Sequence, residues 1–169
     1  MSKVEAFFKL KEPYFHLLIG EKSLVSKLIN SEDDTGIIRQ IEGEKCGTLD
    51  NLFLEFARTF KFPDYFGNNW AAFDECLNDL DWLSNDVYLL FLTDVDKVLT
   101  LSENSFNVFI ETLSRSVKEW TEGRNYDSFP TPPTPFHIVF HCTNGKESEV
   151  ETRLAKAGLE DIDILSINS

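Results

Sequence analysis

The segment from Phe62 to Leu83 brings carboxylates and aromatic rings together in one short part of the chain. It reads FPDYFGNNWAAFDECLNDLDWL and contains no lysine or arginine. Its acidic residues are Asp64, Asp74, Glu75, Asp79 and Asp81. Carboxylates without counter-ions of their own can pair with basic side chains of a partner, and aromatic residues beside them are typical of interface hot spots. The segment therefore predicts a surface that binds a basic protein.

Two of the three histidines could also form a site. His137 and His141 are four residues apart in an expected strand, so both side chains should lie on one face of the sheet. Such a pair could bind zinc or manganese in a metal-dependent enzyme. No HExxH motif, no HxH motif with a nearby carboxylate and no zinc-type Cys/His spacing accompanies it. A structural role for the pair is favoured over a metal site.

Other catalytic signatures are missing from the sequence. It contains no G-x-G-x-x-G, no G-x-x-x-x-G-K-[ST] and no G-x-S-x-G motif. Cys76 falls between Phe73 and Leu77, which belong to a helical apolar stripe, so it is interpreted as a core residue and not as a nucleophile. We therefore expect a protein that is not an enzyme and that uses no cofactor and no small-molecule substrate.

Length and charge limit the class of protein. The chain has 169 residues, 42% of them hydrophobic, which suits one domain over residues 1–169 with a well-buried core. Its net charge is −13, and this disfavours binding to nucleic acid or to an anionic membrane, because phosphate groups need a basic surface. A basic protein is the favoured partner.

Cysteine usage and the N-terminal sequence indicate a compartment. The three cysteines are widely spaced and form no CxxC pair, as expected for core residues in a reducing environment. The N-terminus lacks the apolar region of a signal peptide, and no apolar run approaches the roughly 18 residues that span a bilayer. The sequence predicts a cytoplasmic location.

Apolar runs alternate with segments of helical periodicity along the chain. Strands are expected at residues 14–20, 37–43, 87–93, 136–142 and, weakly, 162–167. Helices are expected at residues 21–30, 49–60, 69–81, 102–120 and 147–157, with a short helical segment at 95–99. A turn at 31–36 and a proline-rich loop at 125–135 separate some of them. This alternation predicts an α/β fold with a small, mainly parallel sheet packed with helices.

The helix expected at 69–81 has two faces. Trp70, Phe73, Leu77 and Leu80 form its inward stripe. The side chains expected to face outward, or to flank the helix at its ends, are Tyr65, Asn69, Ala71, Asp74, Glu75, Asn78 and Trp82. These seven residues are the predicted partner-binding set.

The sequence FPDYFGNNWAAFDECLNDLDW resembles the signature of the barstar family, in which a tyrosine-glycine loop precedes a helix of the type N-x-D-A-L-x-D-C-L. The resemblance extends over residues 36–142 and implies a barstar-like core there. Residues 1–35 would then be a strand-helix extension and residues 143–169 a helix/strand extension, as in larger barstar-related proteins.

Barstar-family proteins are intracellular inhibitors of secreted bacterial ribonucleases, and the resemblance implies that role here. Tyr65 matches the loop tyrosine that packs on the nuclease, Asn69 the asparagine that opens the helix, and Glu75 the aspartate that dominates binding. The sequence departs from the pattern at Ala71, which replaces a second aspartate, and at Asp74, which replaces an aromatic residue.

The leading hypothesis is therefore an inhibitor, immunity protein or antitoxin that blocks the active site of a basic ribonuclease through the acidic helix and its preceding loop. The alternative is an acidic barstar-like scaffold or regulator that binds a basic protein other than a nuclease. The missing carboxylate at Ala71 motivates this alternative.

Overall fold

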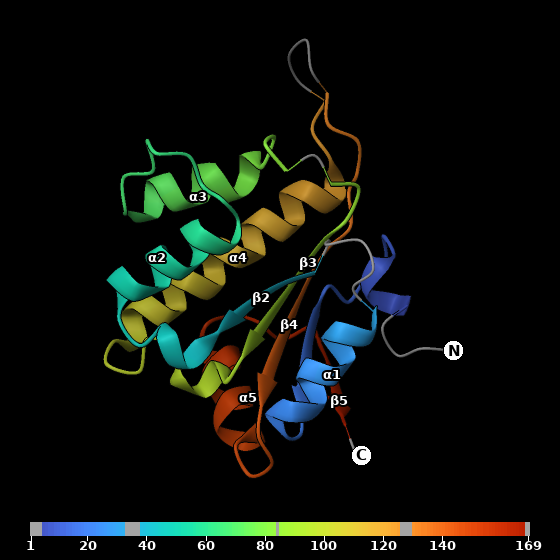
Figure 1. Ribbon diagram of the computed structural model, residues 1–169, viewed down its shortest axis with the longest axis vertical. Helices are drawn as coiled ribbons and strands as arrows, with labels where there is room; N and C mark the ends of the chain where they lie inside the picture. The colour runs from blue at the N-terminus through green and yellow to red at the C-terminus, as the bar shows by residue number, and fades with distance from the viewer. Residues whose placement is uncertain (1–4, 33–37, 84, 126–129, 168–169) are drawn as a thin grey trace.

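The computed structural model describes residues 5–32, 38–83, 85–125 and 130–167. At its centre is a five-stranded sheet with the strand order β2-β3-β4-β1-β5, and every pairing in it is parallel (Figure 1). The strands are β1 Phe15–Ile19, β2 Ile38–Glu42, β3 Tyr88–Thr93, β4 Phe136–Cys142 and β5 Ile162–Ser166. The prediction of an α/β fold with a mainly parallel sheet is confirmed.

Helices cover both faces of this sheet. The α-helices are α1 Lys22–Glu32, α2 Leu49–Thr59, α3 Trp70–Asp79, α4 Glu103–Glu122 and α5 Glu147–Lys156. Short 3-10 helices are η1 Glu5–Phe8, η2 Gly43–Lys45 and η3 Val95–Lys97. The turn expected at 31–36 lies largely outside the described residues, as do positions 126–129 of the proline-rich loop. None of the described helices has the length and apolar character needed to cross a bilayer.

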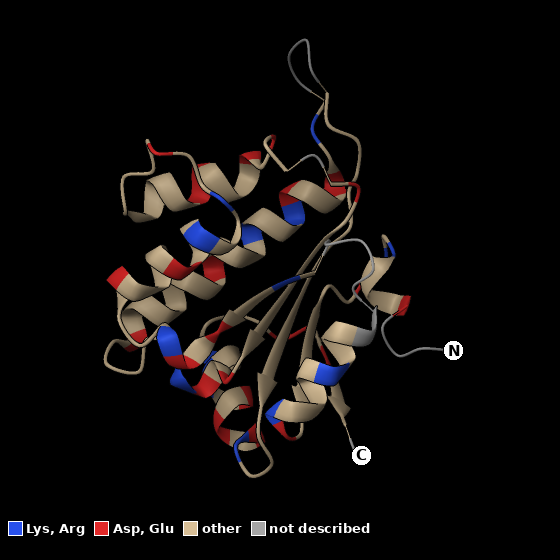
Figure 2. Ribbon diagram, viewed as in Figure 1, with Lys and Arg blue, Asp and Glu red and all other residues tan. Residues whose placement is uncertain are grey.

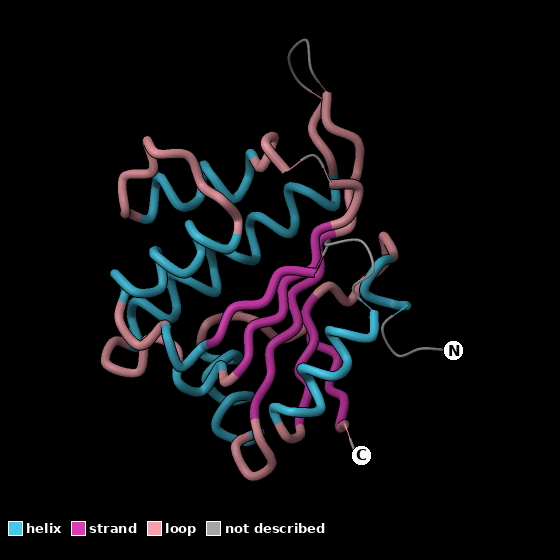
Figure 3. The backbone as a smooth tube through the Cα atoms, in the orientation of Figure 1, coloured by secondary structure: helices cyan, strands magenta, loops and turns pink. Residues whose placement is uncertain are grey.

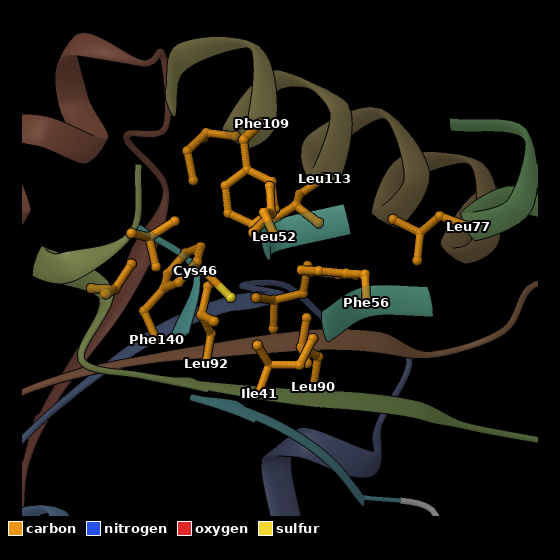
Figure 4. Packing of buried hydrophobic residues seen from close by; sticks show 14 of the residues in the cluster. Ile41, Cys46, Leu52, Phe56, Leu77, Leu90, Leu92, Phe109, Leu113 and Phe140 are labelled. Atoms are coloured by element: carbon orange, nitrogen blue, oxygen red, sulfur yellow. The ribbon is translucent and has the colours of Figure 1, made fainter. Parts of the chain in front are cut away.

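Helices lie on both faces of the sheet (Figure 3), and each face has its own hydrophobic core. The larger core lies between the sheet and the helices α2, α3, α4 and α5, and Figure 4 shows Phe56 of α2 and Phe109 of α4 above Leu90 of β3. The smaller core lies beneath α1 and η1 and includes Phe7 and Val25. Because β3 and β4 are covered on both sides, every residue in them is buried, which explains their nearly continuous apolar sequences.

The two ends of the chain complete the same sheet. β1 pairs with β4 on one side and with β5 on the other, so the N-terminal strand lies inside the sheet and the C-terminal strand forms its edge. All five residues of β1 are buried. Backbone hydrogen bonds thus join the N-terminal strand β1 to β4, and the C-terminal strand β5 to β1.

Candidate partner-binding surface

The loop before α3 is held by two phenylalanines and exposes the tyrosine between them. Phe62 and Phe66 pack edge to face with a centroid distance of 5.0 Å, and Phe66 also contacts Phe53 of α2 at 5.8 Å. Tyr65 is 66% exposed, which is unusual for a large side chain of this protein. Phe62 and Phe66 therefore anchor the loop to the core, and the loop holds Tyr65 in an exposed position.

Asn69 connects this loop to the helix. Its Oδ1 accepts a hydrogen bond of 2.8 Å from the Ala72 N–H, and its Nδ2 donates one of 3.2 Å to the Gly67 carbonyl. A Cβ atom on Gly67 would lie 3.0 Å from that Nδ2 atom, which favours glycine in this turn. Asn69 is thus an N-cap of the kind that stabilises helix starts, and it fixes where α3 begins.

The inward face of α3 agrees with the predicted stripe. Phe73, Leu77 and Leu80 are buried, whereas Trp70 is half-buried and packs its ring edge to face against Phe53 at 5.1 Å. Leu80 ends the helix with a left-handed φ of 49°, which turns the chain while its side chain stays in the core. These contacts fix which side of α3 faces solvent.

The outward face is narrower than the sequence suggested. Ala71 and Glu75 are exposed, as predicted, but Asp74 and Asn78 are only half-exposed. Each follows a core residue by one position, and α4 packs against α3 on that side (Figure 1). Asp74 Oδ1 lies 3.8 Å from Nη2 of Arg115 on α4. Its charge is therefore partly balanced within the protein.

Asn78 and Trp82 also make structural contacts. The Asn78 carbonyl accepts a hydrogen bond from the guanidinium of Arg124. Trp82 is half-buried, its Nε1 donates a hydrogen bond of 2.8 Å to the Phe60 carbonyl, and its ring packs edge to face on Phe62. Trp82 belongs to the predicted partner-binding set beside the end of the helix, and this hydrogen bond turns its ring toward α2.

Negative charge accumulates around the loop and α3. Partial desolvation raises the pKa of Tyr65, and the charges of Asp79, Glu75 and Asp81 raise it further, so its hydroxyl lies in a negative field. Desolvation also raises the pKa of Asp79, and a hydrogen bond to Asp81 adds to this shift. The last turn of α3 has no basic residue, although a helix C-terminus favours cations. Figure 2 shows acidic and no basic residues on α3 itself.

The carboxyl edge of the sheet, where α/β sheets commonly bind ligands, is closed by the protein's own groups. Lys22 Nζ at the start of α1 lies 3.2 Å from Glu44 and 3.3 Å from Asp94. The Asp94 N–H donates to His141 Nδ1 at 3.1 Å, and His141 Nε2 donates to the Gly20 carbonyl at 2.9 Å. These contacts leave the surface around α3 as the candidate site.

The histidines considered for a metal site are engaged within the protein. His137 Nδ1 is 2.8 Å from His16 Nε2, and its Nε2 is 2.7 Å from the Lys9 carbonyl oxygen. Both nitrogens of His141 are hydrogen-bonded to backbone groups. The described part of the chain holds no group of three or more His, Cys, Asp or Glu residues that could bind a metal ion. The placement of His137 and His141 agrees with a structural role.

Sequence reasoning missed the two arginines that face α3. Arg115 lies in α4 and contacts Asp74, and Arg124 lies just after α4 and contacts the Asn78 carbonyl. Both contacts exist only because the fold brings α4 and α3 together. No spacing rule connects residues so far apart in sequence. The one available signal is the position of Arg115 on the polar side of the expected helix.

Comparison with solved structures identifies the architecture. The chain is similar to Cdc6p from Pyrobaculum aerophilum, with a TM-score of 0.56, 13% identity, and coverage of 89% of this chain and 38% of that chain. It is also similar to a chain in the structure of Drosophila ORC bound to GC-rich DNA and Cdc6, with a TM-score of 0.54, 8% identity, and coverage of 90% and 49%. The chain thus spans less than half the length of these proteins, and the likeness concerns the fold alone.

Sequence comparison points to a family. No match was found among curated proteins. The family model described as Barstar (barnase inhibitor) matches residues 37–140. That match includes the capped helix α2, the Tyr65 loop, α3 and α4. The chain belongs to the barstar family.

Proposed function

We propose that this protein is a cytoplasmic inhibitor that binds a basic ribonuclease, such as a nuclease toxin, and blocks its active site with α3 and the loop before it. The observation that carries the proposal is the exposure of Tyr65 and Glu75 on a base-free segment of a barstar-family chain. A ribonuclease active site holds cations that bind substrate phosphates, and a carboxylate can occupy the place of a phosphate among them.

The residues of this surface would have different tasks. Glu75, exposed on the outer side of α3, would meet the cations of the nuclease, and Tyr65 would supply buried contact area at the edge of the interface. Asn69 would act by holding the first turn of α3 in place, because both of its polar groups are used in the cap. Ala71, Asp74, Asn78 and Trp82 would form the margin of the contact.

A second function also has a specific observation in its favour. Ala71 carries no charge and Asp74 is paired with Arg115, so Glu75 is the exposed carboxylate in the middle of α3. An interface with fewer carboxylates suits a less strongly basic partner. This favours a regulator that binds a basic protein other than a nuclease. The net charge of −13 argues against nucleic acid as the partner in either case.

The test is titration of barnase-type and other small, basic, secreted ribonucleases with the purified protein. Inhibition should be complete at a molar ratio near one and should be weakened at least about thirtyfold by Glu75→Gln or Tyr65→Ala, the scale of a hot-spot residue. Glu160→Gln is the matched control, since Glu160 is exposed on the connection between α5 and β5.

Failure to inhibit any such ribonuclease would reject the inhibitor function. If affinity capture then recovered a basic protein that the Glu75→Gln variant no longer binds, the regulator would be supported instead. Loss of activity in the Glu160→Gln control would show that the effect does not come from α3.

A further inference from the structure

Four polar groups lie in a row of close contacts at the amino end of the sheet, on the face opposite α3. Asp163 Oδ2 of β5 is 3.3 Å from His16 Nδ1 of β1, and His16 Nε2 is 2.8 Å from His137 Nδ1 of β4. The last contact in the row joins His137 Nε2 to the Lys9 carbonyl oxygen at 2.7 Å. Both histidines are buried, whereas the side chain of Asp163 is 39% exposed.

The donors and acceptors in this row of groups determine which ring nitrogens carry a hydrogen. The Lys9 carbonyl can only accept, so His137 Nε2 must carry a hydrogen, and a neutral His137 then has a bare Nδ1. That bare Nδ1 requires a hydrogen on His16 Nε2, which leaves His16 Nδ1 bare in a neutral ring. An ionised Asp163 can only accept as well, so two acceptors would face one another across the 3.3 Å contact. When Asp163 is ionised and both rings are neutral, the three contacts in this row therefore have one hydrogen too few.

Distance and exposure place the missing hydrogen in the contact between Asp163 and His16. The contacts made by His137 are the shorter ones and are buried, so a missing hydrogen there would leave two lone pairs in contact away from water. The contact between His16 and Asp163 is the longest, and Asp163 can turn to solvent when it is ionised. Desolvation, followed by the nearby His137, lowers the pKa of His16 to about 4, which disfavours an imidazolium.

Two described ionisable groups act on His16, and η1 and α1 add aromatic and apolar side chains nearby. Asp163 and His137 are the ionisable groups that influence it, η1 contributes the ring of Phe7 at 4.5 Å, and the Tyr14 ring lies 4.9 Å from His137. On the same face α1 contributes the apolar side chains Val25, Leu28 and Ile29.

We propose that Asp163, His16 and His137 form a proton-gated latch that fastens the edge strand β5 and the N-terminal segment at Lys9 to the sheet. The latch is closed when one proton enters the contact between Asp163 and His16, while His16 donates to His137 and His137 donates to the Lys9 carbonyl. It opens at the contact between Asp163 and His16 when that proton is lost at higher pH. The proton belongs to the coupled set and not to one residue.

Asp163→Asn provides a selective test, because the amide can donate to His16 Nδ1 without any added proton. In the unmodified protein, hydrogen exchange of the β5 amides, corrected for the intrinsic pH dependence, should rise roughly two- to tenfold as the latch opens, as expected for one hydrogen bond. Asp163→Asn should abolish this rise. Asp161→Asn, which changes an exposed neighbour in the same way, should retain it.

Nitrogen NMR of the histidine rings gives an independent readout on the unmodified protein. Hydrogens on Nε2 of both His16 and His137, with a single titration shared by His16 and the Asp163 carboxyl carbon, would support the latch. A hydrogen on Nδ1 of His16 at every pH would overturn it. Equal pH dependence of β5 exchange in the unmodified protein and in Asp163→Asn would overturn it as well.

Discussion

Arg115 on α4 reaches Asp74 on α3, with Nη2 3.8 Å from the carboxylate Oδ1. The arginine also pairs with Glu111 one turn earlier at 3.1 Å. Arg115 therefore places a cation at the margin of the proposed binding surface, where it would compete with a basic partner for Asp74 and would repel that partner.

Arg115→Gln should therefore strengthen binding. Removal of the competing cation frees Asp74, and we expect a few-fold higher affinity with a faster association rate at low salt. Stability should change by less than about 0.5 kcal/mol, because exposed ion pairs contribute little. Association kinetics by surface plasmon resonance would measure the gain. Arg58→Gln is the control, since Arg58 pairs with Glu55 on α2; an equal gain there would mean that only net charge matters.

Ala71→Asp should restore the carboxylate that the family pattern has at this position. Ala71 is exposed in the first turn of α3, which contains no acidic residue, so the helix dipole favours a negative charge there. We expect binding to a barnase-type ribonuclease to tighten by about tenfold, as for one additional charge-assisted contact. Inhibition constants would show this. Ala71→Asn separates charge from shape, and an equal improvement by asparagine would contradict the charge-based reason.

Asn69→Ala should lower the free energy of unfolding by about 1 kcal/mol, the usual effect of removing an N-cap. Asn69→Asp should retain stability, because its carboxylate can still accept from the Ala72 N–H near the positive end of α3. Urea unfolding would compare the two. A large loss of stability in the aspartate variant would show that the donation from Nδ2 to the Gly67 carbonyl matters more than the cap.

Acid should destabilise the protein through His141. Burial lowers its pKa, and its Nδ1 must stay unprotonated to accept from the Asp94 N–H. In the unfolded chain a histidine gains its proton near pH 6.5, so the unfolded state binds more protons below that pH. The free energy of unfolding should thus be highest above pH 6.5 and fall by about 1.4 kcal/mol per pH unit below it for each histidine held neutral.

Urea unfolding at a series of pH values would measure this slope, and NMR would show whether the His141 ring remains neutral in the folded protein. Burial lowers the pKa of His137 in the same direction, so the total slope can exceed that of one histidine. A stability that is independent of pH between 5 and 7 would contradict the prediction.

Local sequence signals predicted the elements around the site. Asn69 caps α3, as the family resemblance implied, and Phe73 and Leu77 are buried, as helical periodicity required. Such features depend on residues within one or two turns of one another. The same holds for β4, whose bounds agree with the apolar run at 136–142.

The outer boundary of the site could not be predicted in this way. Whether Asp74 faces solvent depends on α4, and whether Trp82 is free depends on the Phe60 carbonyl, so both outcomes are set by tertiary contacts. The paired strands also bring together His16 and His137, which are 121 positions apart. Helical periodicity describes one element and contains no information on which neighbour will cover its flanks.

The position of β1 also affects the order in which the protein can fold during synthesis. Translation makes β1 first, yet its two neighbours, β4 and β5, are the last strands to leave the ribosome. The apolar sequence FHLLI must therefore remain unpaired while most of the chain emerges, and pairings over such separations close slowly. Nascent chains that stall before β4 would leave this apolar strand unpaired and prone to aggregation.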